Sequence, residues 1–380
     1  MAAPRPASTQ VVLFATHAAP GGIKELWESL ADGLRAHGYD TSLQALYRHE
    51  EDVPSAGNRP WNYIMTGRHA GATGALHMIV ALALWLWRTR PAVVISAMPA
   101  ANILLPLLAR LFSPATRIIE THHTPIGTYH PLLRRLSGSS QSMNNVAFIV
   151  GVSRAVLASL PAATREKQRH KALVIPNAMA PEIETLLATL APTHERIAAS
   201  RNICAVGRLS EQKNYSTLIR AASLLPADVQ IDIIGGGPEE TALKSQIADL
   251  GLQARVRLLG HRSRAETLKR LAAADVFVQI SRWEGHSLAL IEAAKLYLPL
   301  IVSDVPVQIE GVMAQDGTAC GLIAGVDNAE DIADKMTMLL DDPAAYRLWS
   351  DKARRLGSEF SFDAMCYRYC QLIERATEAR

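Results

Sequence analysis

Several features that would point to other classes of protein are missing from this sequence of 380 residues. Only Cys366 and Cys370 of its four cysteines lie close together, and no pair of histidines accompanies them, so we read them as packing residues and expect neither a metal site nor a disulfide framework. No block of Lys and Arg appears and the formal net charge is only +3, which argues against nucleic acid as a partner. We therefore expect a globular protein of a reducing, cytoplasmic compartment.

Long apolar runs are missing as well. The most apolar segment, residues 75–87, is shorter than the roughly 20 residues that span a bilayer. Residues 1–10 lack the apolar core of a signal peptide. We expect residues 75–87 to form a buried helix, with a helix lying on a membrane as the alternative. The N-terminal half holds more Lys and Arg than Asp and Glu, which suits an anionic membrane surface or acceptor at the inner face of the cell membrane.

Short apolar strands alternate with helical stretches along both halves of the chain. Near-continuous apolar strands separated by helices indicate parallel sheets that are covered on both faces. The alternation predicts an α/β protein with two doubly wound, Rossmann-like lobes facing a cleft. The first lobe covers residues 1–180, a connection covers residues 181–200, and the second lobe covers residues 201–360. We expect the final helix, residues 361–380, to pack back on the first lobe.

Two glutamates eight positions apart, Glu284 and Glu292, stand out in the second lobe. The strand before them and the helical spacing after them place Glu284 in a strand-to-helix turn and Glu292 inside the helix. The turn residues Gly285, His286 and Ser287 lie at the helix N-terminus, where free N–H groups favour an anion. Carboxylates accept hydrogen bonds from sugar hydroxyls, so the layout suits a nucleotide-sugar. A capped amphipathic helix with two solvated glutamates fits the same pattern.

Two cations follow the first strand of the second lobe. Arg208 and Lys213 are five positions apart in one loop, where they could clamp a diphosphate and neutralise the charge of a departing nucleoside diphosphate. They also fit ordinary surface cations. The sequence contains no Asp-x-Asp string, the pair with which many sugar-nucleotide enzymes hold a divalent metal, so we expect no metal here.

Glycine pairs and a histidine pair follow other strands. Gly236 belongs to a glycine run that closes a strand, and Gly22 follows another glycine before the first helix; each fits close approach of backbone to a ligand or a plain tight turn. His122 and His123 follow the strand at residues 117–121. A histidine there could bond a sugar hydroxyl or transfer a proton, or it could be structural.

Taken in order, these segments resemble glycosyltransferase family 4 of the GT-B fold. The specific part lies in the second lobe, at residues 206–214, 234–238, 259–260 and 284–292. Weaker similarities occur at residues 21–22, 121–122, 150–154, 174–177 and 359–362. The resemblance implies transfer of a hexose-type sugar from a UDP- or GDP-linked donor to a glycan or lipid-linked acceptor. It also implies retention of the anomeric configuration and no requirement for a metal or other cofactor.

The resemblance also implies a role for each matched residue. Glu284 would bind the donor sugar, Glu292 the ribose, and Arg208 with Lys213 the diphosphate. The expected catalytic set is His122, Glu284, Arg208 and Lys213, and the expected donor-binding set is Gly22, Arg208, Lys213, Gly236, Glu284, Gly285, His286, Ser287, Leu288 and Glu292. Two alternatives remain open: a sugar-nucleotide epimerase on the same fold, and a catalytically silent nucleotide-sugar-binding partner protein.

Overall fold

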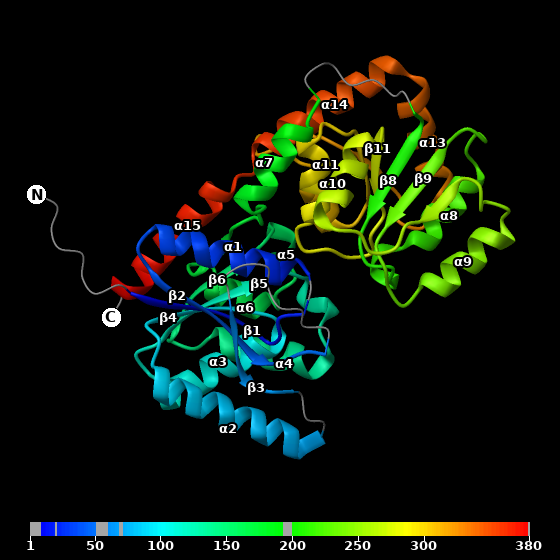
Figure 1. Ribbon diagram of the computed structural model, residues 1–380. Coiled ribbons are helices and arrows are strands. Elements are labelled where there is room, and N and C mark those ends of the chain that lie inside the picture. The colour runs from blue at the N-terminus through cyan, green and yellow to red at the C-terminus, as the bar shows by residue number, and fades with distance from the viewer. Residues whose placement is uncertain (1–8, 20, 51–59, 68–70, 193–199, 379–380) are drawn as a thin grey trace, which may run out of the picture. The chain divides into compact units, whose positions relative to one another are not determined.

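The computed structural model describes residues 9–19, 21–50, 60–67, 71–192 and 200–378. The chain divides into two compact units, shown in Figure 1. The N-terminal unit comprises Met1–Ala180 together with Phe362–Arg380, and the C-terminal unit comprises Pro181–Ser361. Each unit is described by itself.

The N-terminal unit is built on a seven-stranded parallel sheet in the order β3-β2-β1-β4-β5-β6-β7. Its strands are β1 (Gln10–Ala15), β2 (Asp40–Tyr47), β3 (Trp61–Met65), β4 (Val93–Ala97), β5 (Arg117–His122), β6 (Val146–Gly151) and β7 (Ala172–Val174). Its helical segments are α1 (Gly22–Ala36), α2 (Gly71–Thr89), α3 (Pro99–Phe112), η1 (Ile126–Thr128), α4 (Pro131–Gln141), α5 (Arg154–Ala158), α6 (Ala162–Gln168) and α15 (Phe362–Glu378). The strand order reverses between β1 and β4, which is the switch point where such sheets bind ligands.

Alternate residues of the central strands form the two cores of this unit. Val11, Leu13 and Ala15 of β1 join α1 and α15 in one apolar cluster, whereas Val12 and Phe14 join α2 and α3 in another. This is the period-2 pattern of a strand that is buried on both faces. The last helix, α15, completes the first cluster, so the chain returns to the N-terminal unit after leaving the C-terminal one.

Helix α2 is only half buried, which corrects the expectation of a buried helix at residues 75–87. Leu82 and Leu86 enter the core, but Leu76, Leu84 and Trp87 are exposed. The helix lies at one end of the sheet, beside β3, and its outer side is exposed in the part of the unit that the structure describes. None of the described helices combines the length and apolarity needed to cross a bilayer.

The C-terminal unit repeats the architecture with a six-stranded parallel sheet in the order β10-β9-β8-β11-β12-β13. Its strands are β8 (Asn202–Val206), β9 (Gln230–Ile234), β10 (Val256–Leu258), β11 (Val276–Gln279), β12 (Leu300–Ser303) and β13 (Leu322–Ala324). Its helical segments are α7 (Pro181–Leu190), η2 (Glu211–Lys213), α8 (Tyr215–Ser223), α9 (Glu240–Asp249), α10 (Arg264–Ala273), α11 (Leu288–Lys295), α12 (Pro306–Gly311), α13 (Ala329–Asp341) and α14 (Pro343–Ser358). The two doubly wound, Rossmann-like sheets expected from the sequence are therefore confirmed.

The segment expected to connect the lobes is partly helical. Residues 181–190 form α7, which packs against α10 and α11 and belongs to the C-terminal unit. Its Glu184 carboxylate lies 3.5 Å from the Lys295 ammonium of α11. Residues 193–199 of the expected connection lie outside the described part of the chain.

Candidate functional site

The candidate site of the C-terminal unit lies at the switch point of its sheet. Strands β8 and β11 are neighbours, and the loops after them, residues 207–214 and 280–287, leave the same carboxyl edge. The loops are tied together, because the Gln212 side-chain amide donates to the Trp283 carbonyl at 3.0 Å and the Arg282 N–H donates to the Gln212 carbonyl at 2.8 Å. Side chains from both loops are therefore held close to one another.

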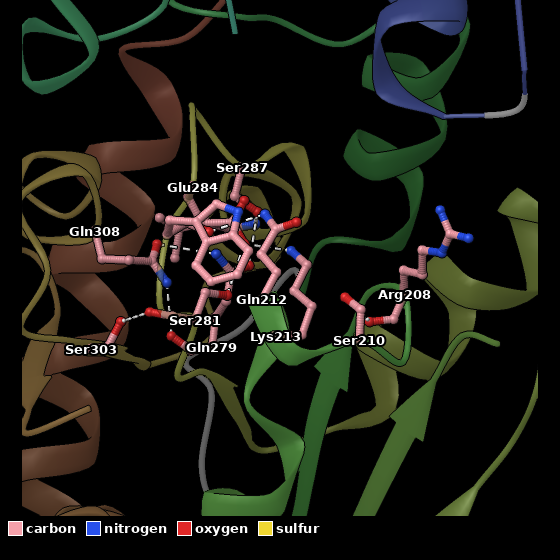
Figure 2. A network of polar contacts seen from close by, with 12 residues as sticks. Arg208, Ser210, Gln212, Lys213, Gln279, Ser281, Glu284, Ser287, Ser303 and Gln308 are labelled. Atoms are coloured by element: carbon pink, nitrogen blue, oxygen red, sulfur yellow. Dashed lines mark hydrogen bonds and ion pairs between the residues drawn. The ribbon is translucent and has the colours of Figure 1, made fainter. Parts of the chain in front are cut away.

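Lys213 and Glu284 form the centre of this site (Figure 2). The Lys213 Nζ lies 2.6 Å from the Glu284 Oε1, and the Ser281 hydroxyl donates to the same oxygen at 2.7 Å. The side chains are only 14% and 9% exposed, so each charge depends on the other for compensation. The two residues, predicted to contact different parts of one ligand, are thus brought together 71 positions apart in sequence.

A second layer of hydrogen bonds holds the Glu284 loop in place. The Ser303 hydroxyl at the end of β12 donates to the Ser281 carbonyl at 2.6 Å. The Gln279 side chain at the end of β11 accepts from Ser287 at 2.8 Å and donates to Gln308 of α12 at 3.0 Å. Strand ends and a helix therefore fix the loop through buried amides and hydroxyls, which restricts the position of the Glu284 carboxylate.

The helix that follows Glu284 begins at Leu288, and Ser287 is its N-cap. The Ser287 hydroxyl accepts a hydrogen bond from the Leu290 N–H at 3.4 Å. The His286 ring packs against Phe360 at 5.0 Å, and burial lowers the pKa of His286 to about 4. This histidine is therefore neutral at pH 7. Gly285 and His286 lie directly before this N-cap, and the anion contact expected of them stays a prediction.

Arg208 takes a different direction from Lys213. Its side chain is exposed and extends away from the Lys213–Glu284 pair, as Figure 2 shows. Both residues leave β8 in the same loop, but only Lys213 turns toward β11. The structure does not join Arg208 to the cluster, and its expected role at a diphosphate stays a prediction.

Glycines let the loops after β8 and β9 pack backbone against backbone. A Cβ on Gly235, which has φ +146°, would lie 2.0 Å from the Gly207 carbonyl oxygen, so a side chain is excluded there. A Cβ on Gly236 would lie 2.6 Å from the His261 ring. The glycine run therefore has a packing role in this structure, and the donor contact expected of Gly236 remains a prediction.

Glu292 is fully buried and already paired. It lies in α11, and its Oε1 accepts a hydrogen bond from the Arg264 guanidinium at the start of α10. The Arg264 side chain is 32% exposed, so the pair connects the interior to the surface. A ribose hydroxyl bound by Glu292 would have to share or replace the contact with Arg264. Spacing alone did not reveal this partner, because it comes from the N-terminus of a different helix.

The adjacent histidines of the N-terminal unit face opposite sides of the sheet. Strand alternation directs Glu120 and His122 toward α4, where the His122 ring contacts the Gln141 amide at 3.2 Å and the Tyr129 hydroxyl at 3.4 Å. His122 is only 1% exposed and lies 3.6 Å from the Glu120 carboxylate, whose pKa burial raises. In this structure the His122 ring is therefore enclosed by protein, which does not favour its predicted contact with a sugar.

His123 lies on the other side, at the carboxyl edge. Its Nε2 is 2.9 Å from the Thr121 hydroxyl, and its ring meets the Trp27 ring edge-on at 5.6 Å. Burial lowers the pKa of His123 to about 3, so it is neutral at pH 7. Strand alternation predicts that the two histidines face opposite sides of the sheet, but both sides are covered, so the sequence alone does not tell which ring is enclosed. Gly22, the remaining predicted residue, is the exposed first residue of α1.

Potential metal ligands converge at one place among the described residues. His37 at the end of α1 meets Cys366 and Cys370 of α15, with the three donor atoms within 4.8 Å of one another. The sequence did not bring the histidine into consideration, because it lies 329 positions from Cys366. The His37 Nδ1 also lies 2.8 Å from the Gly33 carbonyl oxygen, a contact that needs a proton on this nitrogen and disfavours metal binding there. The cluster fits helix packing.

Comparisons with known proteins relate the chain to glycosyltransferases. Residues 193–356 match the family described as "Glycosyl transferases group 1". That range contains Lys213, Glu284, Arg264 and Glu292, and it covers less than half of the chain. The chain is also similar to curated glycosyltransferases, over stretches of 107 to 309 residues.

Three relatives illustrate the similarity. A 4-alpha-N-acetylgalactosaminyltransferase of Campylobacter jejuni, whose name gives a diphospho-undecaprenol acceptor, is 29% identical over 42% of this chain and 42% of its own. A UDP-Gal:alpha-D-GlcNAc-diphosphoundecaprenol alpha-1,3-galactosyltransferase of Escherichia coli is 40% identical over 26% of this chain and 27% of its own. The amylovoran biosynthesis glycosyltransferase AmsD of Erwinia amylovora is 23% identical over 78% of this chain and 81% of its own. AmsD apart, the chain spans less than half the length of the first curated relatives that it matches, with 42–49% of each covered.

Solved structures are similar along nearly the whole chain. Sucrose-phosphate synthase of Thermosynechococcus elongatus superposes with a TM-score of 0.78 at 17% identity, covering 98% of this chain and 100% of that one. HepE of Anabaena in complex with UDP and glucose superposes with a TM-score of 0.75 at 16% identity, covering 96% and 99%. The chain thus has the two-unit GT-B fold of these structures, and residues 193–356 are similar to the glycosyltransferase group 1 family.

Proposed function

We propose that this protein is a glycosyltransferase that moves a hexose-type sugar from a nucleoside-diphosphate donor to a lipid-linked or glycan acceptor. The observation that carries the proposal is the Lys213–Glu284 pair at the switch point of the C-terminal sheet, inside the group 1 domain. Parallel sheets of this order bind nucleotides at that point. We further propose that the enzyme belongs to family 4 and retains the anomeric configuration.

The donor-site roles follow from the chemistry of each side chain. Glu284 is an acceptor of hydrogen bonds only, which suits sugar hydroxyls and not phosphate oxygens. Lys213 carries the complementary positive charge, 2.6 Å away, and would pass from Glu284 to the diphosphate as the donor enters. Glu292 would accept the ribose hydroxyls, with Arg264 keeping its buried carboxylate compensated in the absence of donor.

The leaving diphosphate would be stabilised without a metal. Lys213, Arg208 and the free N–H groups at the start of α11 supply the positive charge and the donors that a departing nucleoside diphosphate requires. The absence of any Asp-x-Asp string in the sequence supports the same proposal. We propose UDP as the first nucleoside diphosphate to test in the donor, because UDP appears in the names of two of the similar proteins.

His123 takes the place at the N-terminal sheet edge that the sequence assigned to His122. Its neutral ring lies at the carboxyl end of β5, with one nitrogen hydrogen-bonded to the Thr121 hydroxyl. A neutral imidazole can donate or accept a hydrogen bond at a sugar hydroxyl near the reaction centre. His122 would then be a core residue that accompanies Glu120.

The acceptor is proposed to be membrane-linked. Names of two similar enzymes include diphospho-undecaprenol, a lipid-linked group. The N-terminal half also has an excess of basic residues. We therefore propose that the protein works at the inner face of the cell membrane as a peripheral enzyme.

A two-stage experiment tests this function. Thermal unfolding of the full chain is first followed with UDP, GDP and their hexose and N-acetylhexosamine derivatives, since a bound donor raises the unfolding temperature by mass action. The best donor is then incubated with lipid-linked and free glycan acceptors in EDTA, and both products are identified, including the anomeric configuration. We expect acceptor-dependent sugar transfer. Isomerised donor without acceptor would indicate an epimerase, and donor binding without turnover would indicate a silent partner protein.

A further inference from the structure

The outer side of α2 is an apolar stripe that its own unit leaves uncovered. Leu76, Val80, Leu84 and Trp87 recur at helical spacing and are each between 46% and 62% exposed. Helices on protein surfaces normally present polar residues on this side, because only one stripe is needed for the core. Four consecutive exposed apolar positions on one stripe are a different pattern from scattered surface leucines.

The neighbouring helices extend this stripe into a surface. Helix α3 packs against both α2 and α4 on the same side of the sheet. The most exposed of their apolar side chains are Leu111 of α3, at 72%, and Leu132 of α4, at 60%. We call the exposed side of α2, α3 and α4 the outer helical face; its apolar residues are Leu76, Ile79, Val80, Leu84, Trp87, Leu107, Leu111, Phe112, Leu132 and Leu136.

The charge of this face has a single sign. Between Val53 and Arg165 the sequence contains ten arginines, no lysine and one acidic residue, Glu120. Glu120 is fully buried in β5, so it contributes no negative charge to the surface. The exposed arginines on or next to the three helices are Arg88, Arg90, Arg110, Arg134 and Arg135. The charged side chains of α2, α3 and α4 that the structure describes are therefore all positive, and they lie beside the apolar residues of the outer helical face.

The helix α1 on the opposite side of the same sheet can be compared with the outer helical face. On α1, Lys24 pairs with Glu28 at 3.2 Å and Arg35 pairs with Asp32 at 2.7 Å, so both signs alternate there. The helices of both sides pack on the same sheet, each over its own apolar core. The acid-free, apolar character of the outer helical face is therefore not a requirement of this fold.

We propose that the outer helical face binds the surface of a membrane containing anionic phospholipids, with its leucines and Trp87 at the acyl boundary and its arginines at the phosphates. Apolar burial and attraction of cations to anionic headgroups are the two terms that hold amphipathic helices at a membrane, and tryptophan favours that interface. A symmetric dimer through the same face is disfavoured, because it would place arginines of one copy against those of the other.

This inference rests on the proposed function and gives it a location. Helices α2, α3 and α4 each follow a strand, so their first turns lie toward the carboxyl edge of the sheet, the edge that carries His123. A unit lying on the membrane by this face would hold that edge close to the headgroups. A lipid-linked acceptor could then reach the edge without leaving the bilayer.

Vesicle flotation of the full chain tests the proposal. Vesicles of phosphatidylcholine alone are compared with vesicles that also contain phosphatidylglycerol, at low and high salt. We expect binding to the anionic vesicles, weakened by salt, and about tenfold weaker binding of a Leu84→Glu, Trp87→Glu variant. An Arg88→Ser, Arg134→Ser, Arg135→Ser variant should lose the preference for anionic lipid.

A matched control separates this surface from general hydrophobicity. Leu224 and Leu348 of the C-terminal unit are 53% and 52% exposed, so a Leu224→Glu, Leu348→Glu variant removes comparable apolar exposure elsewhere. It should bind vesicles as the unaltered chain does. Equal binding of the α2 variant and the control variant, or no preference for anionic vesicles, would overturn the proposal. So would light scattering that shows a dimer abolished by the α2 changes while vesicles remain unbound.

Donor binding keeps this test independent of the proposed function. The α2 variant should unfold at the same temperature as the unaltered chain and show the same thermal shift with UDP-sugars. Vesicle binding without any donor binding would refute the glycosyltransferase proposal but not the proposal that the outer helical face binds membranes. Donor binding without vesicle binding would refute only the proposal that the outer helical face binds membranes.

Discussion

The carboxyl edges of the two sheets share a strand order but differ in chemistry. The C-terminal edge carries an ion pair, Lys213–Glu284, bonded to a serine and fixed by buried amides. The N-terminal edge carries the neutral groups His123 and Thr121, and the carboxylate of Glu120 is directed into the core. An edge that must bind a charged donor needs compensated charges before the donor arrives, whereas an edge that meets sugars needs hydrogen-bonding groups.

The largest effect is expected at the C-terminal edge. Lys213→Ala should lower turnover by about 10²- to 10³-fold, because it removes a preorganised charge at the leaving group. Glu284→Gln should also lower turnover strongly, because it weakens the hydrogen bonds that hold the sugar hydroxyls in the transition state. Sugar transfer is measured by release of the nucleoside diphosphate at saturating donor. Lys244 forms an exposed pair with Glu240 at 2.7 Å, so Lys244→Ala is the matched control and should keep full activity.

The outcome decides whether the pair is functional. Near-normal turnover of Lys213→Ala, with its fold intact by circular dichroism, would contradict the assigned site. The ion pair that distinguishes the C-terminal edge from the N-terminal edge would then stabilise the loops without a role in sugar transfer.

The next effect concerns the buried carboxylate of α11. Arg264→Ala leaves Glu292 without its guanidinium partner, so we expect a loss of about 1–3 kcal/mol in the free energy of unfolding. Glu292→Gln removes the charge and should weaken nucleotide affinity about tenfold while costing less stability, because Arg264 can reach solvent. Calorimetric titration with UDP and chemical unfolding measure the two quantities. Unchanged nucleotide affinity in Glu292→Gln would exclude this carboxylate from the ribose site.

A smaller effect should separate the two histidines of the N-terminal edge. His123→Ala should lower turnover about tenfold with little change in stability. His122→Ala should instead lower stability by about 1 kcal/mol, because the ring fills a buried site beside Glu120, Tyr129 and Gln141. Transfer assays and thermal unfolding of both variants measure this. The reverse result, with catalysis lost only in His122→Ala, would restore the role that the sequence suggested for His122.

The smallest effect is a pH dependence that both edges share. Burial lowers the pKa of His286 to about 4 and that of His123 to about 3, against about 6.5 in an unfolded chain. Between pH 6.5 and those values the unfolded chain binds more protons than the folded chain, so stability is complete above pH 6.5 and falls as the pH decreases. Unfolding temperatures from pH 7.5 to 5 should decline, and less steeply in His286→Gln. An identical slope in that variant would show that His286 does not contribute.

Local pattern was sufficient for the fold of both units. Alternation of short apolar strands with helices predicts parallel sheets, because a strand buried on both faces must be apolar throughout. It also placed Glu284 in a strand-to-helix turn and Glu292 in the following helix, since the change from strand to helical periodicity is visible within that segment. Charged residues that leave neighbouring strands at one edge could therefore be expected to lie near each other.

Partners from distant segments could not be predicted in this way. The contact of Glu292 with Arg264 depends on how α10 and α11 pack, and no local pattern encodes that. A helix with apolar residues on all sides is predicted from sequence to be buried. The exposure of α2 depends instead on its place at the end of the sheet. Arg208 and Lys213 look equivalent in sequence, yet only Lys213, the last residue of the short helix η2, pairs with Glu284.

The sequence by itself determined the two doubly wound sheets and the strand-end positions of Lys213 and Glu284, because periodicity and strand-end position are local properties of the chain. Only the tertiary structure decided which charges pair, which of the adjacent histidines is enclosed, and which side of α2 faces outward. Those choices follow from packing between elements far apart in sequence, where a side chain's free energy depends on burial and on a partner within hydrogen-bond reach.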